Sequence, residues 1–255
     1  MATSKAVAPL LAYVLHRYDW SETSLIVELY TRPLGRVAVV AKGAKRPTSQ
    51  LRPVLLPFQP VLALLGKTPT DEQQDIRLLR SAEWAGGQPL LAASAMFSGY
   101  YLNELLMKLL PRGEAQPVLF DAYADTLAAL ATEPDDSAAL RAFELLLLRE
   151  LGWLPALDEV TLTAAPLQPD APYTLHDEGG LVPGPGPAGI TWQAMEQALA
   201  HRSTSALRTL CGPEAATLRG PLRKLLHYHL GPAPLRTRQV WQGVQRLATP
   251  APQNP

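Results

Sequence analysis

Four basic residues within the short segment 42–53 are the first feature of this sequence that suggests a binding function. Residues 42–53 also contain a glycine, two prolines and several polar residues, which together prevent regular secondary structure. We expect a mobile loop whose positive charges suit phosphate groups. With one arginine just upstream, the candidate residues for polyanion binding are Arg36, Lys42, Lys45, Arg46 and Arg52.

Aromatic residues occur near these charges in the sequence and could stack on nucleobases. The candidates are Tyr18, Trp20 and Tyr30. Barrel proteins that bind single strands commonly run the backbone along a positive groove and stack bases on aromatic rings. Because aromatic residues at strand ends are more often packing residues, the prediction depends first on the charges.

The zero net charge of the chain conceals a strong asymmetry. Residues 1–80 carry a net charge of +5, residues 81–200 carry −12, and residues 201–255 carry +7. Local fields of this kind suggest a polyanion partner for the two basic ends. The alternative is a globule whose parts neutralise one another. The C-terminal candidates for polyanion contact are Arg223, Lys224, Arg236 and Arg238.

No combination of residues in the sequence argues for catalysis. Gly66-Lys67-Thr68 lacks the glycine that a P-loop needs five residues earlier, where the chain has Val61. His227 and His229 are two residues apart, a spacing that points helical side chains away from each other. The single cysteine, Cys211, has no evident base partner and excludes a four-cysteine zinc site. We expect a non-enzymatic, cytoplasmic protein without metal or cofactor.

The elements that position the first basic group have the pattern of β-strands. Residues 25–30 alternate in polarity, and residues 37–41 follow after the turn signal Pro33-Leu34-Gly35, which predicts a hairpin. Further strands are expected at 61–65 and 75–79. Four or five short strands in residues 1–80 predict a small closed barrel of the OB-fold or SH3-like type.

The pattern changes to helical spacing from about residue 90, so residues 81–255 are expected to form a helical domain and the fold class is α+β. Helices are predicted from 102 to 110, after Pro117, at 137–151, at 192–201, at 213–230 and at 235–247. The proline- and glycine-rich stretch 155–190 is expected to be an irregular connector. No run of apolar residues is long enough for a membrane span.

Several strings in this chain resemble the RecO family. They are AYVLH at 12–16, WSETS at 20–24, VAKGA at 40–44, LPF at 56–58, LRSAE at 79–83, GYYLNELL at 99–106, LRAFE at 140–144 and PLRTR at 234–238. The resemblance is dense over residues 8–152 and brief near the C-terminus.

The resemblance implies an OB-fold followed by a helical domain, in a nucleoid-associated protein of DNA repair and recombination. Such a protein binds single-stranded DNA and single-strand-binding protein, anneals complementary strands, and works with RecR and in some bacteria RecF. Many members carry a four-cysteine zinc ribbon after the position of Leu151-Gly152, and this chain resembles the metal-free branch. A barrel with a basic loop does not by itself distinguish DNA from RNA, so an RNA-binding module is the alternative.

The family resemblance also assigns a pocket for the C-terminal tail of single-strand-binding protein to the helix 140–151. That tail is acidic and ends in a hydrophobic residue, so it needs an apolar pocket edged by positive charge. Arg141, Leu148 and Leu151 share one helical face and are the candidates. A leucine on a bundle helix is equally well explained as a core residue.

Overall fold

The computed structural model describes residues 8–66, 76–87, 89–178, 180–231, 235–237, 239–240 and 243. The chain divides into two compact units. The first unit comprises Met1–Ala92 with Leu102–Asp121, and the second comprises Ala93–Tyr101 with Ala122–Pro255.

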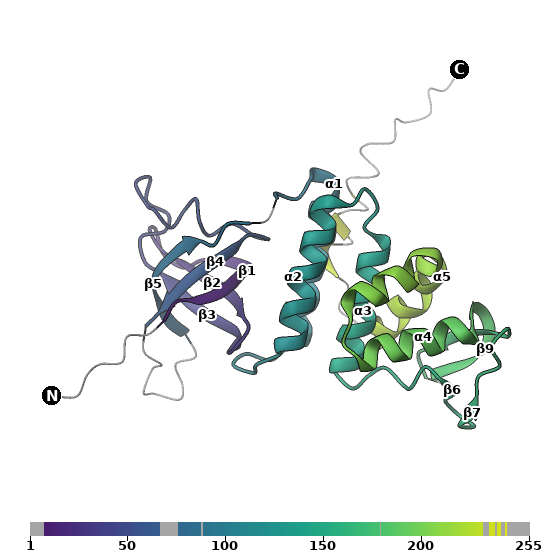
Figure 1. Ribbon diagram of the computed structural model, residues 1–255. Coiled ribbons are helices and arrows are strands. Elements are labelled where there is room, and N and C mark those ends of the chain that lie inside the picture. Colours follow the sequence, from purple (N-terminus) through teal and green to yellow (C-terminus); the bar gives the residue numbers. More distant parts are fainter. Residues whose placement is uncertain are drawn as a thin grey trace, which may run out of the picture. The chain divides into compact units, whose positions relative to one another are not determined.

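A closed five-stranded barrel forms the body of the first unit, as shown in Figure 1. Its strands follow the order β1-β2-β3-β5-β4, and β4 pairs with β1 to close the barrel. All neighbouring strands are antiparallel except β3 and β5, which are parallel. This OB-like barrel confirms the predicted fold class. The strands are β1 (Leu10–Asp19), β2 (Leu25–Thr31), β3 (Gly35–Ala41), β4 (Pro60–Leu65) and β5 (Ile76–Trp84).

The barrel core explains why β2 and β3 were predictable and β1 was not. On β2, Val27 and Leu29 point into the core, as Val37 and Val39 do on β3, so apolar residues recur at every second position. Both faces are buried in the middle of all three strands, but the outer face of β2 contains the polar residue Glu28 and that of β3 contains Arg36. The buried part of β1, residues 12–15, has no charged residue. The ring of Tyr13, for example, packs against Phe120 at a centroid distance of 5.6 Å, which removes the polar alternation.

The hairpin between β2 and β3 turns at Gly35, as the sequence predicts. Gly35 has a positive φ of 62°, a conformation that side chains other than glycine rarely adopt. A Cβ atom there would also lie 1.8 Å from the carbonyl oxygen of Glu114. Glycine is therefore required at this turn by both backbone conformation and space.

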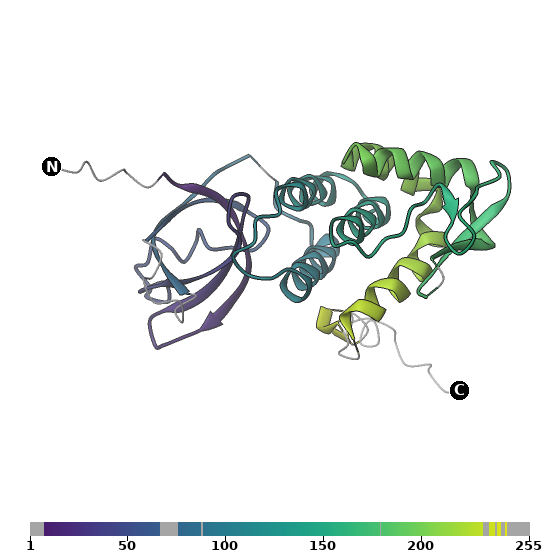
Figure 2. The same ribbon diagram turned by 90° about the horizontal axis from the view of Figure 1, so that it is seen from below.

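Five helices follow among the described residues: α1 (Ala93–Leu109), α2 (Pro117–Thr132), α3 (Ser137–Glu150), α4 (Gly189–Ala200) and α5 (Thr204–Leu230). In the second unit α5, the yellow-green helix of Figure 2, packs against α3. The buried residues of α3 include nine of its fourteen positions, so it is the central helix of this unit. None of the helices in the described chain is long and apolar enough to cross a membrane.

Helix α5 begins earlier than the sequence predicts. We expected a start at Pro213, but the helix begins at Thr204, where the Ser203 side chain accepts a hydrogen bond from the backbone N–H of Ala206. The helix then continues through Pro213 and Pro221. Leucines at 207, 218, 222, 225 and 226 bury one face along the whole length, and this packing outweighs the local cost of the prolines. Most of the predicted helix 235–247 lies outside the described residues.

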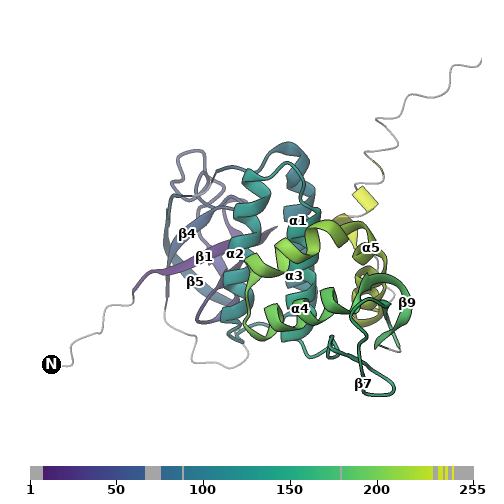
Figure 3. The ribbon, with the colours of Figure 1, turned by 45° about the vertical axis from the view of Figure 1, so that its right-hand side comes forward.

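The prediction of an irregular connector at 155–190 is wrong, because this stretch forms four strands: β6 (Glu159–Val160), β7 (Ala165–Pro166), β8 (Pro172–His176) and β9 (Gly180–Ala188). They pair as two small antiparallel sheets, β6 with β7 and β8 with β9. Figure 3 shows β9 leading into α4, which it also contacts.

Prolines and glycines in β9 occupy a bulge, which is why they suggested an irregular segment. Pro172 pairs with Ala188 while the next residue, Tyr173, pairs with Pro183, so residues 184–187 are extra on the β9 side. Prolines are tolerated in a bulge because no ladder hydrogen bond is required there. Glycine is required at 186, where a Cβ atom would lie 2.0 Å from the Tyr173 carbonyl oxygen.

We predict opposite effects of two glycine substitutions in the second unit. Gly186→Ala forces the bulge apart and should lower the free energy of unfolding by about 1 to 3 kcal/mol. Gly212→Ala lies in α5 with nothing within 4 Å of the added Cβ atom, and should raise it by up to about 1 kcal/mol through helix propensity. Urea unfolding followed by circular dichroism measures both. If the two variants were equally stable, the close approach of residue 186 to the Tyr173 carbonyl oxygen in the bulge would be contradicted.

Candidate nucleic-acid interface

Arg36 is buried in the first unit, which separates it from the other candidate residues. It is only 7% exposed, and its Nη1 donates hydrogen bonds to the carbonyl oxygens of Met107 and Leu110 at the end of α1. The carboxylate of Glu28 lies 3.5 Å from its Nη2 and is also paired with Arg112. Burial lowers the pKa of Arg36, and Glu28 opposes that effect. Because Arg36 is buried and bound to internal partners, its guanidinium group is not exposed to a DNA phosphate.

The basic loop, residues 42–53, is irregular, as the sequence predicts, but it is attached to the barrel. Ala44 is 1% exposed and packs into the core, while the N–H of Lys45 donates to the Thr23 carbonyl oxygen. The ammonium group of Lys45 lies 3.2 Å from the Asp19 carboxylate. The side chains of Lys42, Arg46 and Arg52 are exposed, and Lys45 is half-buried. The mobility of the loop stays a prediction.

A row of apolar side chains crosses the outer surface of the barrel beside this loop. The strand register pairs Tyr18 with Ile26, Ile26 with Val40, and Val40 with Leu78, on β1, β2, β3 and β5. Tyr18 is 42% exposed and Leu78 41%, and the other two are half-buried. The next step of the ladder is Asp19–Leu25–Ala41, immediately before Lys42.

We call Tyr18, Ile26, Val40 and Leu78 the apolar row. Its aromatic member was identified from the sequence, but the other three were missed. Ile26 and Val40 were recognised only as strand residues, and their alignment with Leu78 depends on the parallel pairing of β3 with β5. Only the barrel register brings them together.

The other two aromatic candidates differ in their exposure. Trp20 is 61% exposed, just beyond the end of β1. Tyr30 is fully buried against Phe120, and its hydroxyl donates to the Gln116 carbonyl oxygen at 3.3 Å. Burial raises the pKa of Tyr30. The ring of Tyr30 packs inside the unit, so a nucleobase cannot stack on it.

The C-terminal candidates belong to the second unit. Arg223 and Lys224 are exposed on α5, and Arg236 is exposed in the short described segment that follows. Arg238 lies outside the described residues.

The candidate residues for tail binding are largely buried in the second unit. Arg141 is 8% exposed and its Nη2 lies 2.7 Å from Oε1 of Glu144, which also accepts a hydrogen bond from the hydroxyl of Tyr101. Leu148 is fully buried, and Leu151 is half-buried. The Nε atom of Arg141 and Oε2 of Glu144 are buried without a hydrogen-bond partner in the described structure. Tail binding here requires Arg141 to exchange Glu144 for a carboxylate of the tail.

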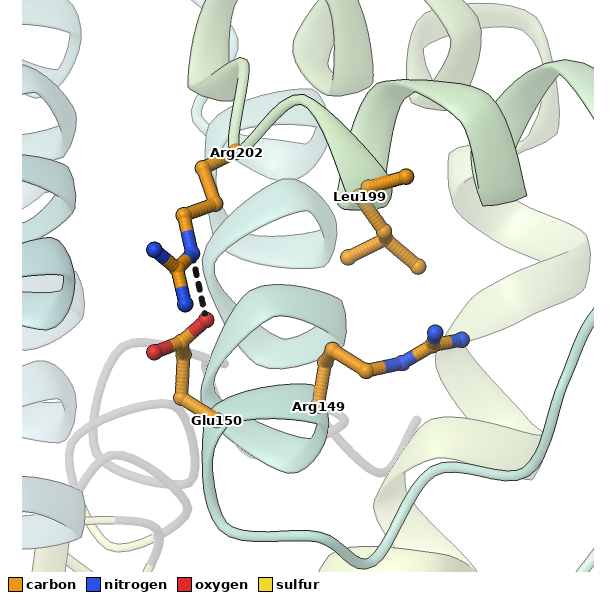
Figure 4. Close-up of a pocket in the computed structure, with 5 residues that line it drawn as sticks. Arg149, Glu150, Leu199 and Arg202 are labelled. Carbon is orange, nitrogen blue, oxygen red and sulfur yellow. Dashed lines mark hydrogen bonds and ion pairs between the residues drawn. The ribbon is translucent and has the colours of Figure 1, made fainter.

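A polar pocket of about 380 Å³ opens between the ends of α3 and α4, as Figure 4 shows. Its two arginines are already matched by carboxylates. Arg202 pairs with Glu150 at 3.2 Å, and Arg149 makes a bidentate pair with Glu196 at 2.6 and 2.7 Å. Because these charges cancel, the pocket has no excess positive charge to offer a polyanion.

The residues considered for catalysis and metal binding have structural surroundings. Cys211 lies inside α5 and is fully buried, and burial raises the pKa of its thiol to about 12. The ring of His229 stacks on Trp153. Within the residues that the structure describes, no group of three His, Cys, Asp or Glu side chains is arranged to hold a metal ion.

The fold defines the class of this protein as one with an N-terminal OB-like barrel joined to a helical unit. Residues 10–87 match the model "Recombination protein O N terminal", and residues 92–239 match "Recombination protein O C terminal". The chain therefore belongs to the RecO family of DNA repair and recombination proteins.

Curated relatives match the chain over nearly its full length. The DNA repair protein RecO of Polaromonas sp. (strain JS666 / ATCC BAA-500) is 49% identical over an alignment 255 residues long. The alignment covers 97% of this chain and 100% of the relative. The RecO proteins of Variovorax paradoxus and Delftia acidovorans are also 49% identical, with the same coverage.

We predict that Arg141→Ala is strongly destabilising, by about 3 to 5 kcal/mol, because it leaves the Glu144 carboxylate buried without its cation. The double variant Arg141→Met/Glu144→Leu removes both charges and should recover most of this loss. Urea unfolding at pH 7 measures both. A double variant as unstable as the single one would show that the ion pair is not the cause.

The stability of Arg141→Ala should also depend on pH. Burial raises the pKa of Glu144 and Arg141 opposes that effect, so removing the arginine raises this pKa further. A raised carboxyl pKa means that the folded state binds the proton more tightly, and stability is lost as the pH rises through that pKa. The stability difference between parent and variant should therefore shrink from pH 7 to pH 5. A difference independent of pH would contradict this account.

Proposed function

We propose that this RecO-family protein is a non-enzymatic recombination mediator. It binds single-stranded DNA, anneals complementary strands, and assists recombinase loading with RecR and in some bacteria RecF. It acts in the cytoplasm, at the nucleoid. The observation that supports the proposal most is the apolar row beside the basic loop on the first unit.

On the barrel, phosphates bind the basic loop and bases lie on the apolar row. Lys42, Arg46 and Arg52 are exposed and available to the DNA backbone. Lys45 is paired with Asp19, whose side chain is 81% exposed, and such surface pairs contribute only about 0 to 1 kcal/mol. A phosphate can replace that partner at little cost. Tyr18 offers the aromatic face on which a base stacks.

The second unit contributes further phosphate contacts through Arg223 and Lys224 on α5. Arg236 and Arg238 extend this set along the chain. These contacts add affinity without sequence preference, because they bind the phosphate backbone rather than base edges.

The second unit also binds the C-terminal tail of single-strand-binding protein, with Arg141, Leu148 and Leu151 as the candidate residues. Arginine suits a carboxylate because it forms charge-assisted hydrogen bonds in a fixed fork. In the free protein Glu144 is paired with one nitrogen of that fork, Nη2, so the tail competes with an internal carboxylate. Leu151 is half-buried and is the more accessible of the two candidate leucines, because Leu148 is fully buried.

We predict that replacing Lys42, Lys45 and Arg46 together by glutamine weakens binding to single-stranded DNA of any sequence. Each lost phosphate contact lowers the slope of log affinity against log salt by about 0.7, so three contacts lower it by about 2. Fluorescence anisotropy over a salt series measures the slope. The control is Arg32→Gln, on the same barrel but paired with Asp121. An unchanged slope in the triple variant would exclude the loop from the DNA site.

The same assay distinguishes DNA from RNA as the ligand. Unlabelled single-stranded RNA of matched sequence competes with labelled DNA. Weak competition supports the recombination mediator. Competition by RNA at a lower concentration than DNA would favour an RNA-binding module instead.

We predict that the double variant Arg141→Met/Glu144→Leu loses affinity for the tail peptide by about 1.5 to 3 kcal/mol, the value of a hydrogen bond to a charged group. This variant avoids the unpaired carboxylate that Arg141→Ala leaves. Its affinity for DNA should match the parent. Calorimetric titration with the tail peptide measures the effect, and a peptide affinity equal to the parent would exclude Arg141 from the tail site.

A further inference from the structure

We infer that Tyr228, with Trp153 and His229 behind it, forms a base-stacking platform for single-stranded nucleic acid on the second unit. The inference rests on the proposed function only for the class of ligand. Its residues are separate from the apolar row and the basic loop of the first unit.

The three rings are in direct contact. His229 stacks on Trp153 with a centroid distance of 4.2 Å and an angle of 8° between the planes. Tyr228 meets the ring of His229 edge-on, at 5.3 Å and 89°. Trp153 follows α3 and the other two residues lie in the last turn of α5, so the platform joins two elements.

The exposure of Tyr228 is difficult to explain as packing. The core-facing side of this end of α5 is formed by Leu222, Leu225 and Leu226, all of which are buried. Tyr228 lies outside that side and is 60% exposed. The stacked pair behind it limits the positions that the Tyr228 ring can adopt, and a ring ordered before binding loses less entropy when a base stacks on it.

Basic residues lie next to the platform on α5. Lys224 is four residues before Tyr228 and therefore lies on the same helical face, and Arg223 has the same relation to His227. Arg223, Lys224 and His227 are all exposed. Neither Arg223 nor Lys224 takes part in an ion pair with the residues that the structure describes. Both side chains are exposed to an external anion.

The sequence supports a polyanion rather than an isolated anion. From residue 215 to residue 255 the chain contains six lysine and arginine residues and no aspartate or glutamate. A polynucleotide presents both phosphates and aromatic bases, which fits adjacent charges and rings. An acidic peptide would use the charges but would not need an exposed tyrosine ring. Partial burial lowers the pKa of His229, which favours the neutral form of the ring that stacks on Trp153.

The test uses the full-length protein with two probes: an oligothymidylate, and an abasic oligonucleotide of the same length that has phosphates but no bases. Tyr228→Leu should weaken binding of the oligothymidylate roughly 5- to 100-fold, the range for loss of one stacked base. It should leave binding of the abasic strand unchanged. Tyr228→Phe is the matched control and keeps the ring, so it should bind both probes like the parent. Replacing Arg223 and Lys224 by glutamine should weaken both probes.

Tryptophan fluorescence gives a second measurement. Part of the quenching that the oligothymidylate causes in the parent should be missing in Trp153→Phe. If Tyr228→Leu binds both probes like the parent, the inference of a base-stacking platform is wrong. It is equally wrong if Tyr228→Leu weakens only the binding of an acidic peptide, because the surface then serves a protein.

The test separates this inference from the barrel proposal. The triple variant of Lys42, Lys45 and Arg46 probes the first unit, and Tyr228→Leu probes the second. Unchanged DNA binding in the triple variant would remove the barrel site and leave the platform standing. The reverse result would remove the platform alone.

Discussion

The buried ion network around Glu28 is the interaction on which the first unit depends. Glu28 has no exposed side-chain surface, and it pairs with both Arg36 and Arg112. Arg36 in turn binds carbonyl oxygens at the C-terminal end of α1, where the helix dipole favours a cation. Removing these charges from water is costly, and the network is stable because nearly every charged group has a partner. It fixes the end of α1 to the outside of β2 and β3.

Only part of the outer surface of β2 and β3 remains open. The outward-facing residues of β2 are Ile26, Glu28 and Tyr30, and the last two are fully buried. On β3 the outward positions 36 and 38 are covered in the same way, and Val40 is half-buried. What is left of this surface is the apolar row at one end of both strands. The candidate DNA site therefore lies at the end of these strands that remains exposed.

Sequence patterns predicted β2, β3 and α3, and failed for two of the other strands. The β2–β3 hairpin and the position of α3 were predictable from periodicity. Strand β1 and the bulged strand β9 were not, because the first lacks polar alternation and the second contains prolines in a bulge.

The candidate site residues were chosen from the sequence on the assumption that charged side chains are exposed. That assumption fits Lys42, Arg46 and Arg223, which are exposed. For Arg36 and Arg141 the same assumption failed, because each has a buried carboxylate partner, Glu28 or Glu144. These pairs form only when strands or helix turns bring the two charges together. The apolar row could not be found for a related reason, since its members are neighbours across strands and not along the chain.

The burial of Cys211 gives the helical unit an internal reporter. A thiol with a pKa of about 12 is almost entirely protonated at neutral pH, and the thiolate is the form that reacts with alkylating reagents. Because the chain has no other cysteine, its alkylation rate measures how often α5 separates from its neighbours. The same inertness means that a cysteine introduced on the surface can carry a fluorophore alone, without first replacing the native one.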